Sequence, residues 1–178
     1  MQKGPISTLS EIFAFISTIA VLFALICPRV DALSQDEISG RAIAISGDTL
    51  RLKNEEDKSE IEVRLWGIDA PEKNQHCETR TGRSIDCGIL AKNALKATIR
   101  RKNLTCVDFD KNDEGTITAL CYLGDKILNS MVVRSGWAMA YKRESSDYLG
   151  IEKVARLAEK GIWQYRFDKP WIWRKRQK

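Results

Sequence analysis

Acidic and basic side chains gather in two short stretches of the first half of the chain. Residues 47–52 carry Asp48, and residues 63–72 carry Arg64, Asp69 and Glu72. Two carboxylates, a carbonyl and water suit a hard cation such as Ca²⁺ or Mg²⁺, and the fork of an arginine suits a phosphate. If the two stretches are neighbours, Asp48 and Asp69 can form a divalent-cation site beside Arg64.

The second stretch has the pattern of a strand with one buried face. Val63 and Leu65 alternate with the residues between them, and Pro71 ends the strand because it has no N–H for a sheet ladder. We therefore expect Asp69 and Glu72 on an exposed turn at the end of this strand. Residues 47–52 indicate a turn followed by a second alternating strand.

The rest of the pattern predicts a mainly β protein with α-helices, of the α+β class. Strands are predicted at residues 38–45, 49–53, 60–66, 104–109 and 116–123, and three helices at residues 89–99, 127–135 and 146–160. Five short strands, with one helix after the third and more after the fifth, favour a small closed β-barrel. Closure leaves no strand edge unpaired.

Two motifs carry a family resemblance. The sequence G-D-T-L-R-L at residues 47–52, followed by V-R-L-W-G-I-D-A-P-E at residues 63–72, resembles the staphylococcal nuclease (thermonuclease-like) family. The order and spacing of the pair are specific, and the resemblance covers roughly residues 38–163. It implies a five-stranded OB-fold barrel with about three flanking helices.

The resemblance also implies a role for each matching residue. Asp48 and Asp69 match the family's metal-binding aspartates, and Ala70 stands where a backbone carbonyl completes the metal site. Glu72 matches the glutamate proposed to activate or orient the attacking water, and Arg64 matches the arginine on the scissile phosphate. The implied cofactor is Ca²⁺ or another divalent cation, which offsets phosphate charge and activates water.

One match to the family fails. The family carries a second arginine at the start of the fifth strand, in a Tyr-Gly-Arg context. Here Thr116 takes that place, after Asp113, Glu114 and Gly115. Threonine supplies no cation, and the two acids repel a phosphodiester. Cations that could reach in from neighbouring loops are Arg80, Arg83 and Lys111.

Charge and hydropathy indicate export and a polyanionic partner. The formal net charge is +5, and the first 32 residues contribute none of it because Lys3 and Arg29 balance Glu11 and Asp31. Residues 12–27 are apolar apart from Ser17 and Thr18, and 16 residues are short for a membrane span of ~20. A cleaved signal peptide is favoured over an uncleaved membrane anchor or a buried helix.

The cysteines agree with an oxidising compartment. Cys77 and Cys87 bracket a polar loop, and Cys106 and Cys121 fall on a predicted β-hairpin, so we predict these two disulfides. Other pairings remain possible from the sequence. A zinc site using His76 beside Cys77 is the rival, but no Cys-x-x-Cys spacing supports it.

Three segments are expected. They are a signal peptide or membrane anchor at residues 1–32, the thermonuclease-like domain at 33–164 and a basic, Trp-rich tail at 165–178. Trp171, Trp173 and Arg174 in the tail could stack on bases and bind phosphates. The favoured interpretation is that its aromatic residues pack on the barrel and its charges stay in solvent.

Three functions fit these observations. The first is a periplasmic or secreted, metal-dependent nuclease acting on DNA or RNA, weakened by Thr116. The second is a degenerate family member that binds nucleic acid or an anionic polysaccharide, for example in exopolysaccharide production. The third is a structural or inner-membrane-anchored domain without a polyanionic partner. Metal binding separates the third from the first, and only turnover separates the first from the second.

Overall fold

The computed structural model describes residues 37–111 and 117–177 of the 178-residue chain. All that follows concerns these described residues, which belong to one compact unit within residues 35–178. The predicted signal segment and the stretch from Asp113 to Thr116 lie outside the described residues. Within the described ranges, no helix is both long enough and apolar enough to cross a membrane.

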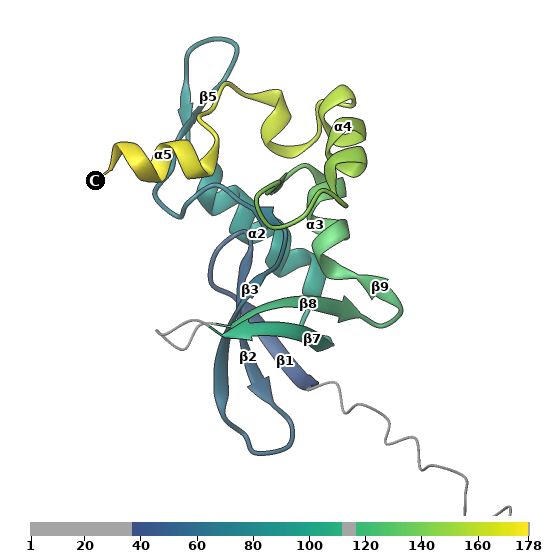
Figure 1. The fold of residues 1–178 in the computed structure, drawn as a ribbon. Helices are drawn as coiled ribbons and strands as arrows, with labels where there is room; N and C mark the ends of the chain where they lie inside the picture. Colours follow the sequence, from purple (N-terminus) through teal and green to yellow (C-terminus); the bar gives the residue numbers. More distant parts are fainter. Residues whose placement is uncertain (1–36, 112–116, 178) are drawn as a thin grey trace, which may run out of the picture. The chain divides into compact units, whose positions relative to one another are not determined.

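Five strands form the barrel (Figure 1). They are β1 (Ile38–Ala44), β2 (Thr49–Asn54), β3 (Glu60–Leu65), β7 (Asn103–Lys111) and β8 (Ile117–Leu123). Neighbours in the order β3-β2-β1-β7-β8 are antiparallel, and a parallel pairing of Val63 with Ile117 joins β3 to β8. This pairing closes the sheet, so the predicted five-stranded OB-fold barrel is confirmed.

Alternation along the strands fills the barrel. Leu50 and Leu52 on β2 and Val63 and Leu65 on β3 are fully buried, while Arg51 between the first two is exposed. This period of two is the pattern from which the strands were predicted. It places the side chains of residues 49 and 64 on the outer surface, where a site can form.

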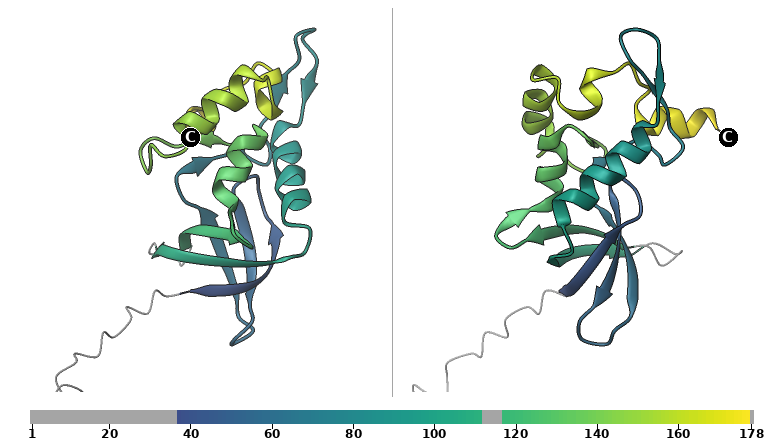
Figure 2. Two further views of the ribbon diagram at one scale, coloured as in Figure 1. Left: turned by 90° about the vertical axis from the view of Figure 1, so that its right-hand side faces the viewer. Right: turned by 180° about the vertical axis from the view of Figure 1, so that it is seen from behind.

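The helices gather at one end of the barrel (Figure 2). They are α2 (Cys87–Ile99), α3 (Leu128–Ser135), α4 (Leu149–Leu157) and α5 (Pro170–Arg176), with a 3₁₀ turn at Gly161–Gln164. The first three match the predicted helices, and α5 is an additional helix in the described chain. On α2, Ala91, Leu95 and Ile99 are buried at helical spacing against the barrel.

Several two-residue strands form further pairs outside the five barrel strands. Strand β5 (Cys77–Glu78) pairs with β6 (Ser84–Ile85), and β9 (Lys126–Ile127) pairs antiparallel with the end of β8. Strand β4 (Ile68–Asp69) pairs with the distant β10 (Met139–Ala140). Asp69 is therefore not on an exposed turn, as the sequence suggested, but in a buried strand separated from β3 by a turn at Gly67 (φ 75°).

Both predicted disulfides are present. Cys77 and Cys87 are joined at an S–S distance of 2.08 Å, and Cys106 and Cys121 at 2.05 Å. The first bond links the β5–β6 hairpin to the start of α2. It also excludes the zinc alternative, because Cys77 has no free thiolate, and His76 instead lies 2.8 Å from Asp86.

A buried asparagine ties the end of β3 to β8. The Asn129 amide donates to the carbonyls of Trp66 at 2.9 Å and Ala119 at 3.3 Å, and its oxygen accepts the Cys121 N–H at 3.1 Å. The side chain is fully buried. It therefore holds the turn that carries the chain from β3 into β4.

Asn129→Leu is expected to lower the free energy of unfolding by about 1–3 kcal/mol, because buried backbone groups lose their partner. Urea denaturation measures this loss. The matched control is Asn103→Leu, which removes an exposed amide bonded to Glu55. An equal, small effect of both substitutions would contradict the structural role of Asn129.

Candidate active site

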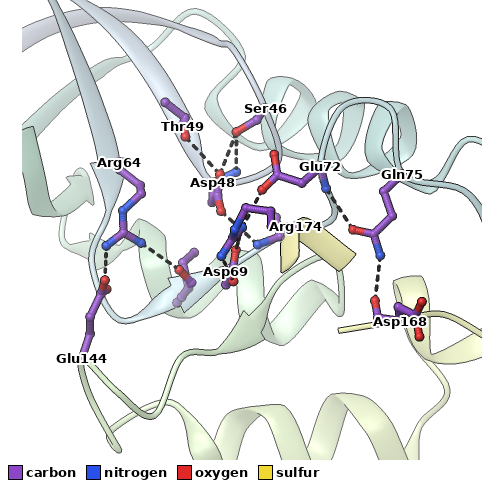
Figure 3. Close-up of polar contacts among 12 residues, drawn as sticks. Ser46, Asp48, Thr49, Arg64, Asp69, Glu72, Gln75, Glu144, Asp168 and Arg174 are labelled. Atoms are coloured by element: carbon purple, nitrogen blue, oxygen red, sulfur yellow. Dashed lines mark hydrogen bonds and ion pairs between the residues drawn. The ribbon is translucent and has the colours of Figure 1, made fainter. Parts of the chain in front are cut away.

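A cavity of about 580 Å³ opens beside the strand ends. It is lined by the ends of β1 to β4, the loop after β4, the turn after β10 and α5. The charged lining comprises five acids, Asp48, Glu62, Asp69, Glu72 and Glu144, and three bases, Arg64, Lys73 and Arg174. All four charged side chains predicted to form a site are thus in one cavity (Figure 3).

Asp48 is fixed in the β1–β2 turn by three donors. Its Oδ1 accepts the hydroxyls of Ser46 at 2.7 Å and Thr49 at 3.0 Å, and its Oδ2 accepts the Ala70 N–H at 2.9 Å. Gly47 permits this approach, since a Cβ there would lie 2.7 Å from the Cβ of Ala70. The prediction that the two acidic stretches meet is therefore confirmed by the geometry.

Asp69 is almost completely buried, with 3% of its surface exposed. Its Oδ1 and Oδ2 accept hydrogen bonds from Nη1 of Arg174 at 2.8 Å and Nη2 at 2.7 Å. Burial raises the pKa of Asp69 to about 6; the Arg174 hydrogen bond opposes this rise, and the neighbouring charge of Asp48 adds to it. The carboxylate thus depends on a nearby cation for its charge.

Glu72 lies in the loop after β4, close to α2. Its N–H donates to Oε1 of the fully buried Gln75 at 3.2 Å, and its carboxylate accepts Nη1 of Arg174 at 2.5 Å. Gly88 lets α2 pack directly under this loop, because a Cβ there would lie 1.7 Å from the Glu72 carbonyl oxygen. The position of Glu72 is therefore set by backbone packing.

Arg64 projects from β3, on the strand before Asp69 rather than on the same one. Its guanidinium pairs with Glu144 and donates to the Ile68 carbonyl at 3.3 Å. Glu144 also accepts the Gly67 N–H at 2.8 Å. This glutamate holds both the arginine and the β3–β4 turn, and sequence analysis did not identify it.

Arg174 lies in the tail whose charges could bind phosphates, but the sequence did not predict its contact with the site. The tail was expected to leave its charges in solvent, but α5 places this guanidinium between Asp69 and Glu72, and its side chain is only 42% exposed. The hydrogen bond to Asp69 raises the pKa of Arg174. The available signal was the apolar Pro170, Trp171 and Trp173 beside it, which mark a packed segment.

The other cations suggested by the sequence are elsewhere or not described. Arg80 forms an exposed pair with Glu159 at 2.6 Å, and Arg83 is exposed on the β5–β6 hairpin. Lys111 lies at the end of β7, and nothing is described of its side chain. Neither Arg80 nor Arg83 lines the cavity.

The residues present fit a hard divalent cation in chemical type. Asp48 and Asp69 supply carboxylate oxygens, and the preferred ligands of Ca²⁺ are oxygens of this kind. The described residues hold no group of three or more acidic, histidine or cysteine side chains poised around a metal. The counter-charge beside Asp69 in this structure is the guanidinium of Arg174.

Comparison with known proteins identifies the family. Residues 62–165 match the staphylococcal nuclease homologue family. A Haemophilus influenzae protein named an uncharacterized endonuclease is 32% identical over 86% of this chain and 83% of its own length. An Escherichia coli protein of the same description is 29% identical, over 79% of this chain and 88% of its own.

A third relative has a different description. The succinoglycan biosynthesis protein ExoI of Rhizobium meliloti is 29% identical over 83% of this chain and 75% of its own length. The family match covers more than half of the chain, and it includes Arg64, Asp69 and Glu72. Together with the closed barrel and the shared cavity, it shows that this chain belongs to the staphylococcal nuclease family.

Proposed function

We propose that this protein is a divalent-metal-dependent nuclease that hydrolyses phosphodiester bonds of DNA or RNA. The observation that carries the proposal is the convergence of Asp48, Arg64, Asp69 and Glu72 on one cavity. Endonuclease-named relatives at 29% and 32% identity support it. The site has the oxygen ligands for a cation, an arginine for the phosphate and a carboxylate for water.

Each residue of the site then has a distinct role. Asp48 and Asp69 would hold Ca²⁺ or another divalent cation with the Ala70 carbonyl, and the cation would supply charge neutralisation and an activated water. Arg64, already oriented by Glu144, binds the scissile phosphate, whose charge increases as the water attacks. Glu72, which faces the same cavity, accepts a proton from that water.

Export is part of the proposal. Two disulfides support an oxidising compartment, the periplasm or the exterior. The apolar residues 12–27 would direct the chain there, either as a removed signal or as an inner-membrane anchor. Separating membrane and soluble fractions of cells, followed by mass determination of the mature chain, distinguishes these two fates.

A second candidate function is binding of an anionic polysaccharide without hydrolysis. The similarity to a succinoglycan biosynthesis protein favours it. Turnover decides between the two candidates. A purified chain that binds polyanions but cleaves none, at high enzyme concentration with Ca²⁺, would establish the second.

Asp69→Asn is expected to abolish metal-dependent DNA cleavage by the purified, disulfide-bonded protein and to weaken Ca²⁺ binding, because a buried carboxylate ligand is lost. Cleavage is measured with Ca²⁺ and then with a chelator, and Ca²⁺ affinity by calorimetry. Asp86→Asn, which alters an exposed carboxylate beside His76, is the control. Metal-dependent cleavage that co-purifies with Asp69→Asn at the rate of the wild type would refute the proposed metal site.

Arg64→Gln is expected to lower kcat/KM for DNA cleavage by about 10³–10⁵-fold, the range found for an arginine that stabilises a phosphoryl-transfer transition state. Single-turnover kinetics measure the effect. The control is Arg51→Gln on β2. The exposed Arg51 does not line the cavity, and its Nε lies 4.0 Å from Oε2 of Glu60. Equal rates of the two variants would exclude Arg64 from the chemistry.

A further inference from the structure

We propose that Arg174, on the C-terminal helix α5, is the second phosphate-binding cation of the active site. This inference rests on the proposed nuclease function and deepens it. The residue lies beyond the matched family domain of residues 62–165. The substrate group that Arg174 recognises is the phosphodiester of a nucleic acid strand.

The guanidinium of Arg174 has a free edge. Nη1 donates to Asp69 and Glu72, and Nη2 donates to the second oxygen of Asp69. An arginine has five N–H donors, so the Nε hydrogen and one Nη2 hydrogen remain, side by side on one edge. Among the described residues none accepts a hydrogen bond from Nε, and two adjacent donors suit two phosphate oxygens.

The position of Arg174 is built by contacts along the whole C-terminal segment. Gln75 donates to the Asp168 carbonyl at 2.7 Å, and Glu78 and Arg166 exchange two backbone hydrogen bonds of 2.8 Å. The ring of Trp171 packs 5.6 Å from that of Tyr141. A seven-residue helix is not stable by itself, so these contacts keep α5 at the cavity that Arg174 lines.

The charge of the cavity requires this cation. Five acids and three bases line it, and the base nearest to Asp69 is Arg174. Arg64 is already paired with Glu144. Without Arg174, a phosphodiester would meet five acids against two bases, Arg64 and Lys73, and the first of these is already paired.

The two arginines reach this cavity from different elements of the fold. Arg64 comes from β3 and is anchored by Glu144 on the turn after β10, whereas Arg174 comes from α5 and is anchored on the loop after β4. Both line the same cavity. A phosphate in this cavity would pair with the Nε–Nη2 edge of Arg174, while Nη1 and Nη2 stay bonded to Asp69 and Glu72.

The test compares Arg174→Gln with Lys175→Gln, which removes the same charge from an exposed neighbour on the same helix. Arg174→Gln is expected to lower kcat/KM for DNA cleavage by at least about 10²-fold, with the range for such arginines extending to ~10³–10⁵. Lys175→Gln is expected to change it less than about threefold, since an exposed charge near a site acts mainly on encounter. Arg174→Lys, which keeps the charge but not the fork, should fall between.

Calorimetry with Ca²⁺ alone separates phosphate binding from support of the metal site. Ca²⁺ affinity of Arg174→Gln should be equal to or higher than that of the wild type, because a competing cation leaves Asp69. A variant that loses Ca²⁺ affinity together with activity would show that Arg174 only positions the acids, and would overturn the proposal. Faster cleavage by Arg174→Gln would overturn it too, and would show that α5 blocks the site.

A binding measurement tests the role of Arg174 independently of whether the protein cleaves nucleic acid. A single-stranded phosphorothioate oligonucleotide, measured by anisotropy in the presence of a chelator, should bind at least about tenfold more weakly to Arg174→Gln than to Lys175→Gln. If the wild type cleaves nothing, the nuclease proposal fails, while this binding difference still supports phosphate recognition by Arg174. Equal binding by both variants would overturn the proposal whatever the activity.

Discussion

The ion pair between Asp69 and Arg174 is the interaction around which the site is organised. A carboxylate that is 3% exposed and faces a second one, Asp48, must be protonated or be given a counter-charge. Arg174 gives it through two hydrogen bonds of 2.7 and 2.8 Å. The β4–β10 pairing that buries Asp69 and the C-terminal segment that delivers Arg174 therefore depend on each other.

The packed barrel supports the Asp69–Arg174 pair from below the turns that carry the acids. Its inner face is filled by leucine and valine side chains, and its outer face leaves Arg64 at the end of β3. The turns that leave the barrel then carry the acids. At Gly47, Gly67 and Gly88 the backbone lies closer to neighbouring atoms than a side chain would permit. These glycines have no chemical role themselves, but they let the turns and α2 pack closely around the site.

Local patterns in the sequence were sufficient to predict the barrel and four of the charged residues that line the cavity. Alternating residues predicted five strands, and two short motifs predicted that Asp48, Arg64, Asp69 and Glu72 share one location. The burial of Asp69 was not predictable, because β10 lies about 70 residues from β4 and each is only two residues long. Strands this short leave no periodic signal.

The pairing of Glu144 and Arg174 with the site was not predicted, for a related reason. Glu144 lies 80 positions from its partner Arg64, and Arg174 lies 105 positions from its partner Asp69. Local sequence patterns do not predict contacts between residues so far apart. An arginine after two tryptophans is equally consistent with a solvated charge. The tryptophans and the proline could indicate that the tail packs on the domain. They could not indicate which acid would pair with Arg174.

The placement of Arg174 means that the limits of the fold and those of the active site differ. The matched family domain ends at residue 165, and a barrel cut there would keep its five strands and both disulfides. It would nevertheless lack a wall of its cavity. In this chain, the boundary of the family domain is therefore not the boundary of the cavity.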